Sequence, residues 1–161
     1  MKTKVLAING VIAALYIAIS TLIIPIAFGP IQFRIPEIFN HLIVFNKKYF
    51  FGIVVGVFIT NLFSELGSLD LIFGLAHSIL SLLIIILLSR VIKNKWILLF
   101  ANTFVFTFNM FIIAYELNIA FKLPFLLTWL TTAAGEFIIM AIGMPLMYAM
   151  DKKINFKKLI D

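Results

Sequence analysis

The chain has 161 residues and no cysteine; 63% of its residues are apolar, 12% are charged, and its mean hydropathy is +1.15. A soluble domain is about half apolar and about a quarter charged, so this composition excludes a water-exposed globular protein and predicts one whose main solvent is lipid. The net charge of +6 does not indicate nucleic-acid binding, because the basic residues stand in short clusters between apolar runs, where membrane topology signals belong.

Six apolar runs follow one another along the chain, and a membrane-spanning helix needs about 20 residues. The first run, 5–26, is too long for a signal peptide and is followed by no cleavage pattern, so we expect it to be the first spanning helix. The others are 38–45, 49–66, 71–91, 96–117 and 123–150. Because no repeat or linker interrupts them, the sequence predicts an all-α integral membrane protein with a single domain over 1–161.

The second run, 38–45, is too short to cross about 30 Å of hydrocarbon unaided. If it crosses, Arg34 and Lys122 are the only basic residues on the outer side, which is what the positive-inside rule predicts. If it is re-entrant, Lys47 and Lys48 move to the outside and the asymmetry is lost. We therefore predict six transmembrane helices in a single bundle with cytoplasmic N and C termini, and a short second helix that is tucked inside the bundle or lies where the bilayer is thinned.

Polar side chains share helix faces, mostly in the outer half of the membrane. An ionisable group in hydrocarbon costs about 2.5 to 3.5 kcal/mol on insertion scales and is a functional-site hypothesis by default. Glu136 is the clearest case because it falls near mid-depth, and its alternative role is a structural hydrogen bond, for example with Asn109. The candidate substrate-binding residues are Arg34, Glu37, Asn40, Asn61, Asp70, His77, Asn109, Trp129 and Glu136.

These residues describe an acidic, amide-rich pocket that opens to the outside, with Trp129 as a stacking wall. Such a pocket suits a small planar ligand that is rich in hydrogen-bond donors, neutral or cationic. Asn61 and Asn109 have an equally good alternative role as hydrogen bonds between helices. Asp70 precedes an apolar run and could instead cap a helix. His41 and His77 lack the close ligand spacing of known metal motifs, so no metal site is predicted.

A long outer connection, 25–36, separates the first two runs, and long loops on a rigid scaffold tend to carry function. Within it we expect Arg34 to pair with Glu37 or Glu65. A second feature, the small-residue strip, lies on one face of the first helix and would let another helix approach closely. The strip consists of Ala7, Gly10, Ala14 and Ala18. Internal packing and an external partner explain it equally well, and the pair Gly52 and Gly56 carries the same ambiguity.

Four segments together resemble a known family: FGPIQFRIPE at 28–37, the alanines of the small-residue strip, NLFSELGSLDLIFG at 61–74 and AAGEFIIMAIGMPL at 133–146. They are similar to the substrate-binding S components of energy-coupling factor (ECF) transporters, and most similar to the queuosine-precursor (QueT) type. The resemblance implies a six-helix protein of the plasma membrane, not itself an enzyme and without a cofactor. It would capture a micronutrient outside the cell and work with a transmembrane coupling protein and two cytoplasmic ATPases.

The implied substrates are 7-deazaguanine precursors of queuosine, such as the 7-aminomethyl base. That base is planar, cationic at its aminomethyl group and guanine-like at its edge, which agrees with the acidic pocket. By family likeness, Gly10, Ala14 and Ala18 contact the coupling protein. The chain departs from the family at Pro36, where Ser is usual, and at Glu65, where Pro is expected.

Two other classes of function compete with this interpretation. A stand-alone channel or proton-coupled carrier would use Glu136 and Glu116 as a relay, but it predicts polar groups through the inner half, where only Asn102 and a few hydroxyls lie. An intramembrane enzyme using His41 or His77 as a base lacks a nucleophile at recognisable spacing. The sequence also contains no G-x-x-x-x-G-K-[ST] loop for ATP and no G-x-S-x-G elbow.

Overall fold

The computed structural model describes residues 2–23, 34–64 and 66–161, so the predicted outer connection is seen only from Arg34 onward and Glu65 lies outside the described residues. The described part is built from helices and contains no strand. Its elements are α1 (Thr3–Leu22), the 3-10 helix η1 (Ile35–His41), α3 (Leu42–Phe45), the 3-10 turn η2 (Lys47–Tyr49), α4 (Phe50–Leu62), α5 (Ser68–Leu88), α6 (Lys95–Asn109), α7 (Phe111–Phe121), α8 (Phe125–Ile154) and α9 (Phe156–Ile160).

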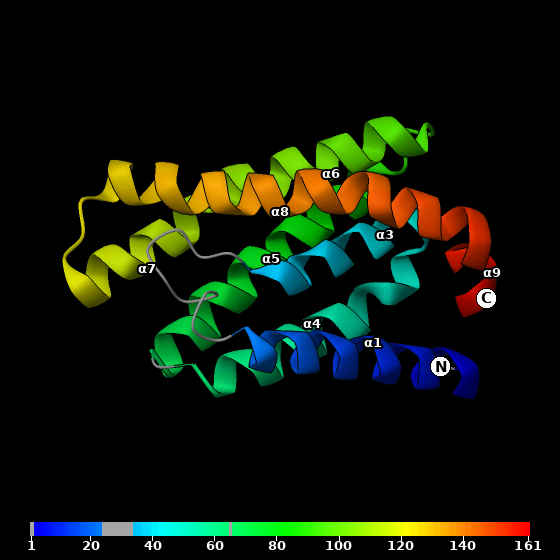
Figure 1. Cartoon of the computed structure of the whole chain (residues 1–161), viewed down its shortest axis with the longest axis horizontal. Coiled ribbons are helices and arrows are strands. Elements are labelled where there is room, and N and C mark those ends of the chain that lie inside the picture. Colours follow the sequence, from blue (N-terminus) through cyan, green and yellow to red (C-terminus); the bar gives the residue numbers. More distant parts are fainter. Residues whose placement is uncertain (1, 24–33, 65) are drawn as a thin grey trace.

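Four helical segments among the described residues are long and apolar enough to cross a membrane: α1, α5, α8 and the stretch Lys95–Phe121, which joins α6 and α7. They run roughly along the long axis of one bundle (Figure 1). Large apolar side chains cover their outer faces; Leu6, Phe104 and Leu130 are each more than half exposed. An apolar exterior of this kind fits helices that face lipid.

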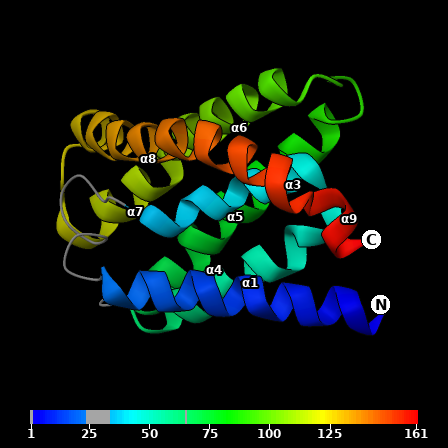
Figure 2. The same ribbon diagram turned by 45° about the vertical axis from the view of Figure 1, so that its right-hand side comes forward.

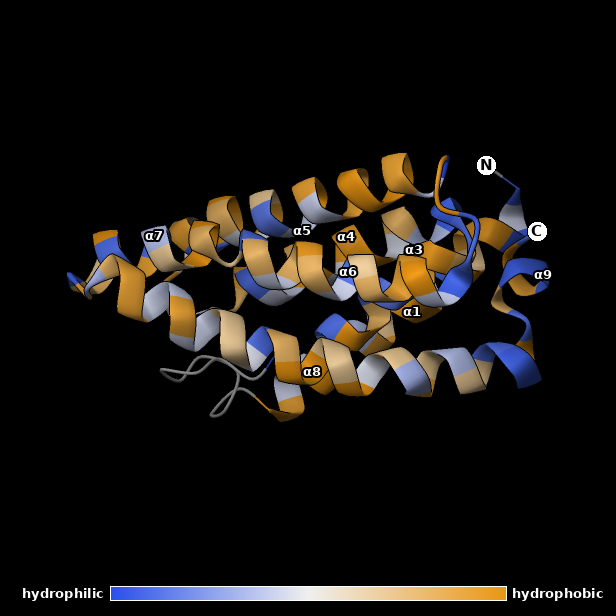
Figure 3. Cartoon of the chain, turned by 90° about the horizontal axis from the view of Figure 1, so that it is seen from above, coloured by the Kyte–Doolittle hydropathy of each residue, from blue (hydrophilic) through white to orange (hydrophobic). Residues whose placement is uncertain are grey.

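Both termini lie at the same end of the bundle in Figures 1 and 2. Hydrophilic residues gather at that end in Figure 3. Two ion pairs join the basic clusters there to acidic residues near the C-terminus: Lys48 Nζ lies 2.8 Å from Asp161 Oδ1, and Lys95 Nζ lies 2.7 Å from Asp151 Oδ2. Basic clusters that are far apart in the sequence therefore meet at one end of the bundle.

The short second segment lies inside the bundle, where it contacts α1, α5, α6 and α8 (Figure 2). Its first seven residues form η1 rather than the expected α-helix, and α3 continues it. The 3-10 form has three residues per turn and therefore aligns Glu37 with Asn40. With a rise of about 2.0 Å per residue in η1 and about 1.5 Å in α3, the segment is roughly 20 Å long, shorter than the hydrocarbon core.

The two groups of small residues have different surroundings. Gly52 and Gly56 of α4 face α1, where a Cβ atom at Gly52 would lie 2.8 Å from the backbone oxygen of Asn9. Asn9 also accepts a 2.7 Å hydrogen bond from the Gly52 N–H, so this glycine pair is an internal packing surface between α1 and α4. The small-residue strip lies on another face of α1 and is exposed. Within the described part of the chain, a Cβ atom at Gly10 would meet nothing within 4 Å.

Candidate functional site

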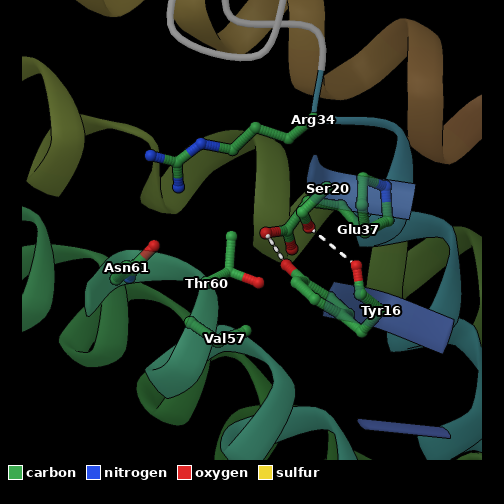
Figure 4. Close-up of a pocket in the computed structure, with 8 residues that line it drawn as sticks. Tyr16, Ser20, Arg34, Glu37, Val57, Thr60 and Asn61 are labelled. Atoms are coloured by element: carbon green, nitrogen blue, oxygen red, sulfur yellow. Dashed lines mark hydrogen bonds between the residues drawn. The ribbon is translucent and has the colours of Figure 1, made fainter. Parts of the chain in front are cut away.

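A small cavity lies between α1, η1 and α4 (Figure 4). Its volume is about 20 Å³, roughly room for one water molecule. Three of the predicted site residues line it, together with five that were not predicted. The lining residues are Tyr16, Ser20, Arg34, Pro36, Glu37, Val57, Thr60 and Asn61.

Glu37 is the buried carboxylate of this cavity, and both of its oxygens have partners. The Tyr16 hydroxyl of α1 donates a 2.7 Å hydrogen bond to Oε1, and the Asn40 side-chain amide donates to Oε2 from the next turn of η1. Tyr16 therefore fixes η1 against α1. Hydrogen bonds to an ionised group contribute about 1.5 to 3 kcal/mol each, which explains how a carboxylate can be kept in a site with 1% exposure.

Arg34 immediately precedes η1 and pairs with Asp70 of α5, with 3.7 Å between Nη2 and Oδ1. Ser64 donates a hydrogen bond to the other oxygen of Asp70. The expectation that Arg34 pairs with Glu37 is wrong, because that carboxylate is held by neighbours on its own helix and on α1. The other expected partner, Glu65, lies outside the described residues.

Asn61 lines the cavity and also joins two helices. Its side-chain nitrogen donates a 3.0 Å hydrogen bond to the backbone oxygen of Asp70, and its amide packs directly against Gly74 of α5. A side chain at Gly74 would collide with this amide. The structural role that the sequence left open for Asn61 is therefore present, whatever part the residue has in ligand binding.

Two further carboxylates, Glu116 of α7 and Glu136 of α8, are fully buried. In the part of the chain that the structure describes, no amide, hydroxyl or cationic group donates a hydrogen bond to any of their oxygens. Glu116 lies beside Asp70, to which its carboxyl is hydrogen-bonded, and Glu136 lies near Glu37, with Arg34 as the cation near both. The acidic groups thus form two pairs, Glu37 with Glu136 and Asp70 with Glu116, and a single guanidinium influences both.

The two histidines are engaged with the backbone. His77 Nε2 faces the Phe106 carbonyl at 3.1 Å, and His41 Nε2 faces the Met140 carbonyl at 2.9 Å. A carbonyl can only accept, so in each ring we assign the hydrogen to Nε2. His41 Nδ1 then accepts from the Asn102 amide at 3.0 Å, which ties η1 to α6 and α8. Among the described residues, no group of three His, Cys, Asp or Glu side chains could hold a metal ion.

Six of the nine predicted residues do not line the cavity, and two of these six, Asn109 and Trp129, form hydrogen bonds elsewhere in the bundle. The side-chain amide of Asn109 donates a 2.9 Å hydrogen bond to Ser81 Oγ, so the expected alternative bond to Glu136 is not formed. Trp129 donates from Nε1 to the Phe108 carbonyl at 3.1 Å, and its ring packs in an aromatic cluster with Phe108 and two neighbouring phenylalanines.

The contribution of α1 to the cavity was not predicted from the sequence, which indicated a function only for the small-residue strip on that helix. A signal was present: Asn9, Tyr16 and Ser20 follow helical spacing on the face that packs against α4, and all three are buried. The seven-residue spacing of Asn102, Asn109 and Glu116 likewise indicated Glu116 as a site residue. From the sequence, this residue was named only as part of the alternative proton relay.

Comparisons with known proteins match almost the whole chain. The model of the QueT transporter family matches residues 6–152. A protein of Lactococcus lactis subsp. cremoris, named queuosine precursor transporter QueT, is 34% identical over 168 residues, and the match covers 98% of this chain and 98% of the relative. No solved structure matches the chain.

Proposed function

The chain belongs to the QueT transporter family, and on that premise we propose that it is the substrate-capture subunit of an ECF-type importer. It is a multi-pass membrane protein with a transport role. In the proposed cycle it binds a 7-deazaguanine precursor of queuosine from the extracellular side of the plasma membrane. An ATPase-driven coupling complex then completes the uptake.

The observation that carries the ligand proposal is the buried acidic cluster. Among the described residues, no amide, hydroxyl or cationic group donates to two of its carboxylates, Glu116 and Glu136, and buried acceptors normally have such a donor. Carboxylates accept hydrogen bonds only, and the edge of a guanine-like base presents N–H and NH₂ donors. A planar, donor-rich base would therefore supply what these carboxylates lack.

The cavity is smaller than such a base, so side chains must move when the ligand binds. Glu37 is held by two hydrogen bonds, whereas Arg34 is held by one ion pair at 3.7 Å and Nη2 has no hydrogen-bond partner in the described part. Arg34 is therefore easier to displace than Glu37.

For the topology we propose six crossings with both termini in the cytoplasm. The common position of the termini and of the basic clusters supports an even number of crossings and follows the positive-inside rule. Two of the crossings, Ile35–Phe45 and α4, are shorter than a usual span. Contacts with neighbouring helices on several sides allow the first of these to sit inside the bundle.

For the coupling step we propose that a helix of the transmembrane coupling protein docks on Gly10, Ala14 and Ala18. This part of the small-residue strip is exposed along α1, while another face of the same helix packs against α4. Small residues allow close approach of helix backbones in lipid. The sequence contains no phosphate-binding loop, so the proposal assigns ATP hydrolysis to two cytoplasmic ATPases.

The test of ligand binding is calorimetry on the isolated protein in detergent with 7-aminomethyl-7-deazaguanine. We expect saturable binding without ATP or another subunit. Glu136→Gln replaces one acceptor oxygen by a donor, so the affinity should fall by about 1.5 to 3 kcal/mol, the range for hydrogen bonds to charged groups. Asp161→Asn, an exposed carboxylate at the other end of the bundle, is the matched control and should bind like the wild type.

Absence of binding to the wild type at high ligand concentration would contradict the assignment, and unchanged affinity in Glu136→Gln would leave that residue with a structural role. Uptake by proteoliposomes that contain this chain alone, driven by a proton gradient, would favour the carrier alternative over the ECF mechanism.

A further inference from the structure

Asp70 and Glu116 form the less satisfied of the two acidic pairs. They lie on α5 and α7, which pack against each other, and both are buried, with 1% and 0% exposure. Asp70 accepts a hydrogen bond from Ser64 at one oxygen, whereas no hydroxyl, amide or cationic group in the described chain donates to Glu116, whose carboxyl is hydrogen-bonded to Asp70 itself. Apart from this bond between the two carboxyls, their four oxygens have one side-chain hydrogen-bond donor, Ser64.

Arg34 gives an independent sign that this pair is built for a cation. The residue is 8% exposed, and its side chain extends away from Glu37, on the side of Asn61 (Figure 4). Its Nη2 atom lies 3.7 Å from Asp70 Oδ1, beyond the usual 2.7 to 3.2 Å of a hydrogen bond, and has no hydrogen-bond partner within the described residues. Arg34 and Asp70 therefore form an ion pair in which Nη2 makes no hydrogen bond, although arginine and carboxylate can form a bidentate pair.

The shape of the cation explains why this arrangement suits a ligand better than it suits arginine. A guanidinium is flat and rigid, with its donors fixed in one plane. A primary ammonium is a compact charge with three donors that can rotate toward several acceptors. An ammonium placed beside Asp70 and Glu116 could donate to both carboxylates at once, which Arg34 does not do in this structure.

We infer that Asp70 and Glu116 form an ammonium subsite and that the Arg34 guanidinium is its stand-in cation before the ligand binds. The inference rests on the proposed function and extends it by dividing the ligand between two acidic pairs. Glu136, near Glu37, accepts hydrogen bonds from the donor edge of the planar base, and Asp70 and Glu116 bind its aminomethyl group. The protein then selects an amine-bearing base over a neutral analogue of the same ring.

The test compares two ligands with one ring, 7-aminomethyl-7-deazaguanine and its neutral 7-cyano counterpart, by calorimetry on the isolated protein in detergent. The readout is the ratio of their affinities, in which contacts to the shared ring cancel. The wild type should prefer the amine by about tenfold or more, the effect of one hydrogen bond to a charged group. Glu116→Gln should reduce the ratio to near one, through weaker binding of the amine alone.

Two further variants distinguish the subsite from a general effect on folding. Arg34→Gln removes the competing cation and should raise the ratio, a change of opposite sign that damage to the fold would not produce. Glu136→Gln is the matched control in the other acidic pair and should weaken both ligands with little change in the ratio. If Glu116→Gln does not fold, Asp70→Asn should show the same loss of preference.

The inference is overturned if Glu116→Gln or Asp70→Asn leaves the ratio unchanged, or if Arg34→Gln lowers it. If neither heterocycle binds the wild type, the proposed function fails, and methylammonium chloride becomes the probe of the subsite. Greater thermal stabilisation of the wild type than of Glu116→Gln by methylammonium, relative to sodium chloride, would then support the subsite. Equal stabilisation would overturn it.

Discussion

The contact between α1 and α4 can be tested by adding one methyl group at Gly56. A Cβ atom there would lie 2.8 Å from Tyr16 Cβ and 2.9 Å from Tyr16 Cγ. These atoms are next to the backbone of α1, so a rotation of the tyrosine ring alone does not relieve the clash. Tyr16 is also fixed at its far end, because its hydroxyl donates to Glu37. Gly56→Ala must therefore push the helices apart or break that hydrogen bond.

The magnitude follows from three contributions. Overpacking of a close contact costs about 1 to 3 kcal/mol. Replacing a helical glycine with alanine returns about 0.5 to 1 kcal/mol. The net loss in the free energy of unfolding is then about 1 kcal/mol if the hydrogen bond survives, and larger by about 1.5 to 3 kcal/mol if the bond from Tyr16 to Glu37 is lost.

The assay is reversible unfolding in mixed micelles, with Gly10→Ala as the matched control. Both glycines lie inside helices, but a Cβ atom at Gly10 meets nothing within 4 Å in the described structure. Gly10→Ala should therefore be as stable as the wild type or more stable by about 0.5 to 1 kcal/mol. If Gly56→Ala unfolds at the same denaturant concentration as Gly10→Ala, α1 and α4 do not pack as described and the position assigned to Tyr16 is wrong.

Two further predictions concern the exterior of α1 and the end of the bundle that carries both termini. The double variant Ala14→Leu and Ala18→Leu should bind ligand normally but fail to co-purify with the proposed coupling protein. The variant Leu15→Phe, at an exposed position beside the strip, should assemble. Normal assembly and uptake by the double variant would place the docking site elsewhere. The hydrogen bond from Lys48 lowers the pKa of the exposed Asp161 carboxyl below its usual 3.8. The ion pair therefore stabilises the fold above about pH 4, and this stabilisation is lost as the pH falls through the lowered pKa. The small difference in melting temperature between the wild type and Asp161→Asn should accordingly close on acidification, and a constant difference would argue against the ion pair.

The helical spacing of polar residues in the sequence was sufficient to predict part of the site's arrangement. Periodicity placed Asp70, His77 and Ser81 on one face of the fourth predicted helix, and all three are buried in the structure. This prediction succeeds because the direction of a side chain on a helix depends only on its own backbone. The sequence likewise identified Glu136 as a mid-depth carboxylate, and the structure places it fully inside the bundle. Its role in ligand binding stays a prediction.

The partners of these side chains were decided by the tertiary structure. Arg34 pairs with Asp70 rather than Glu37, because η1 is a 3-10 helix that aligns Glu37 with Asn40 and brings it to Tyr16. Such partners depend on the rotation and depth of one helix relative to another, and no local pattern encodes these.

The sequence by itself determined that the chain is helical, lies in a membrane and belongs to the QueT transporter family, since composition, hydropathy and family motifs can be read without knowing which helices touch. Only the tertiary structure showed that two similar rows of small residues differ, with Gly52 and Gly56 packed against α1 and the small-residue strip left exposed. The physical reason is that a small residue permits close approach of another helix, but the neighbouring residues of the whole bundle decide which helix arrives.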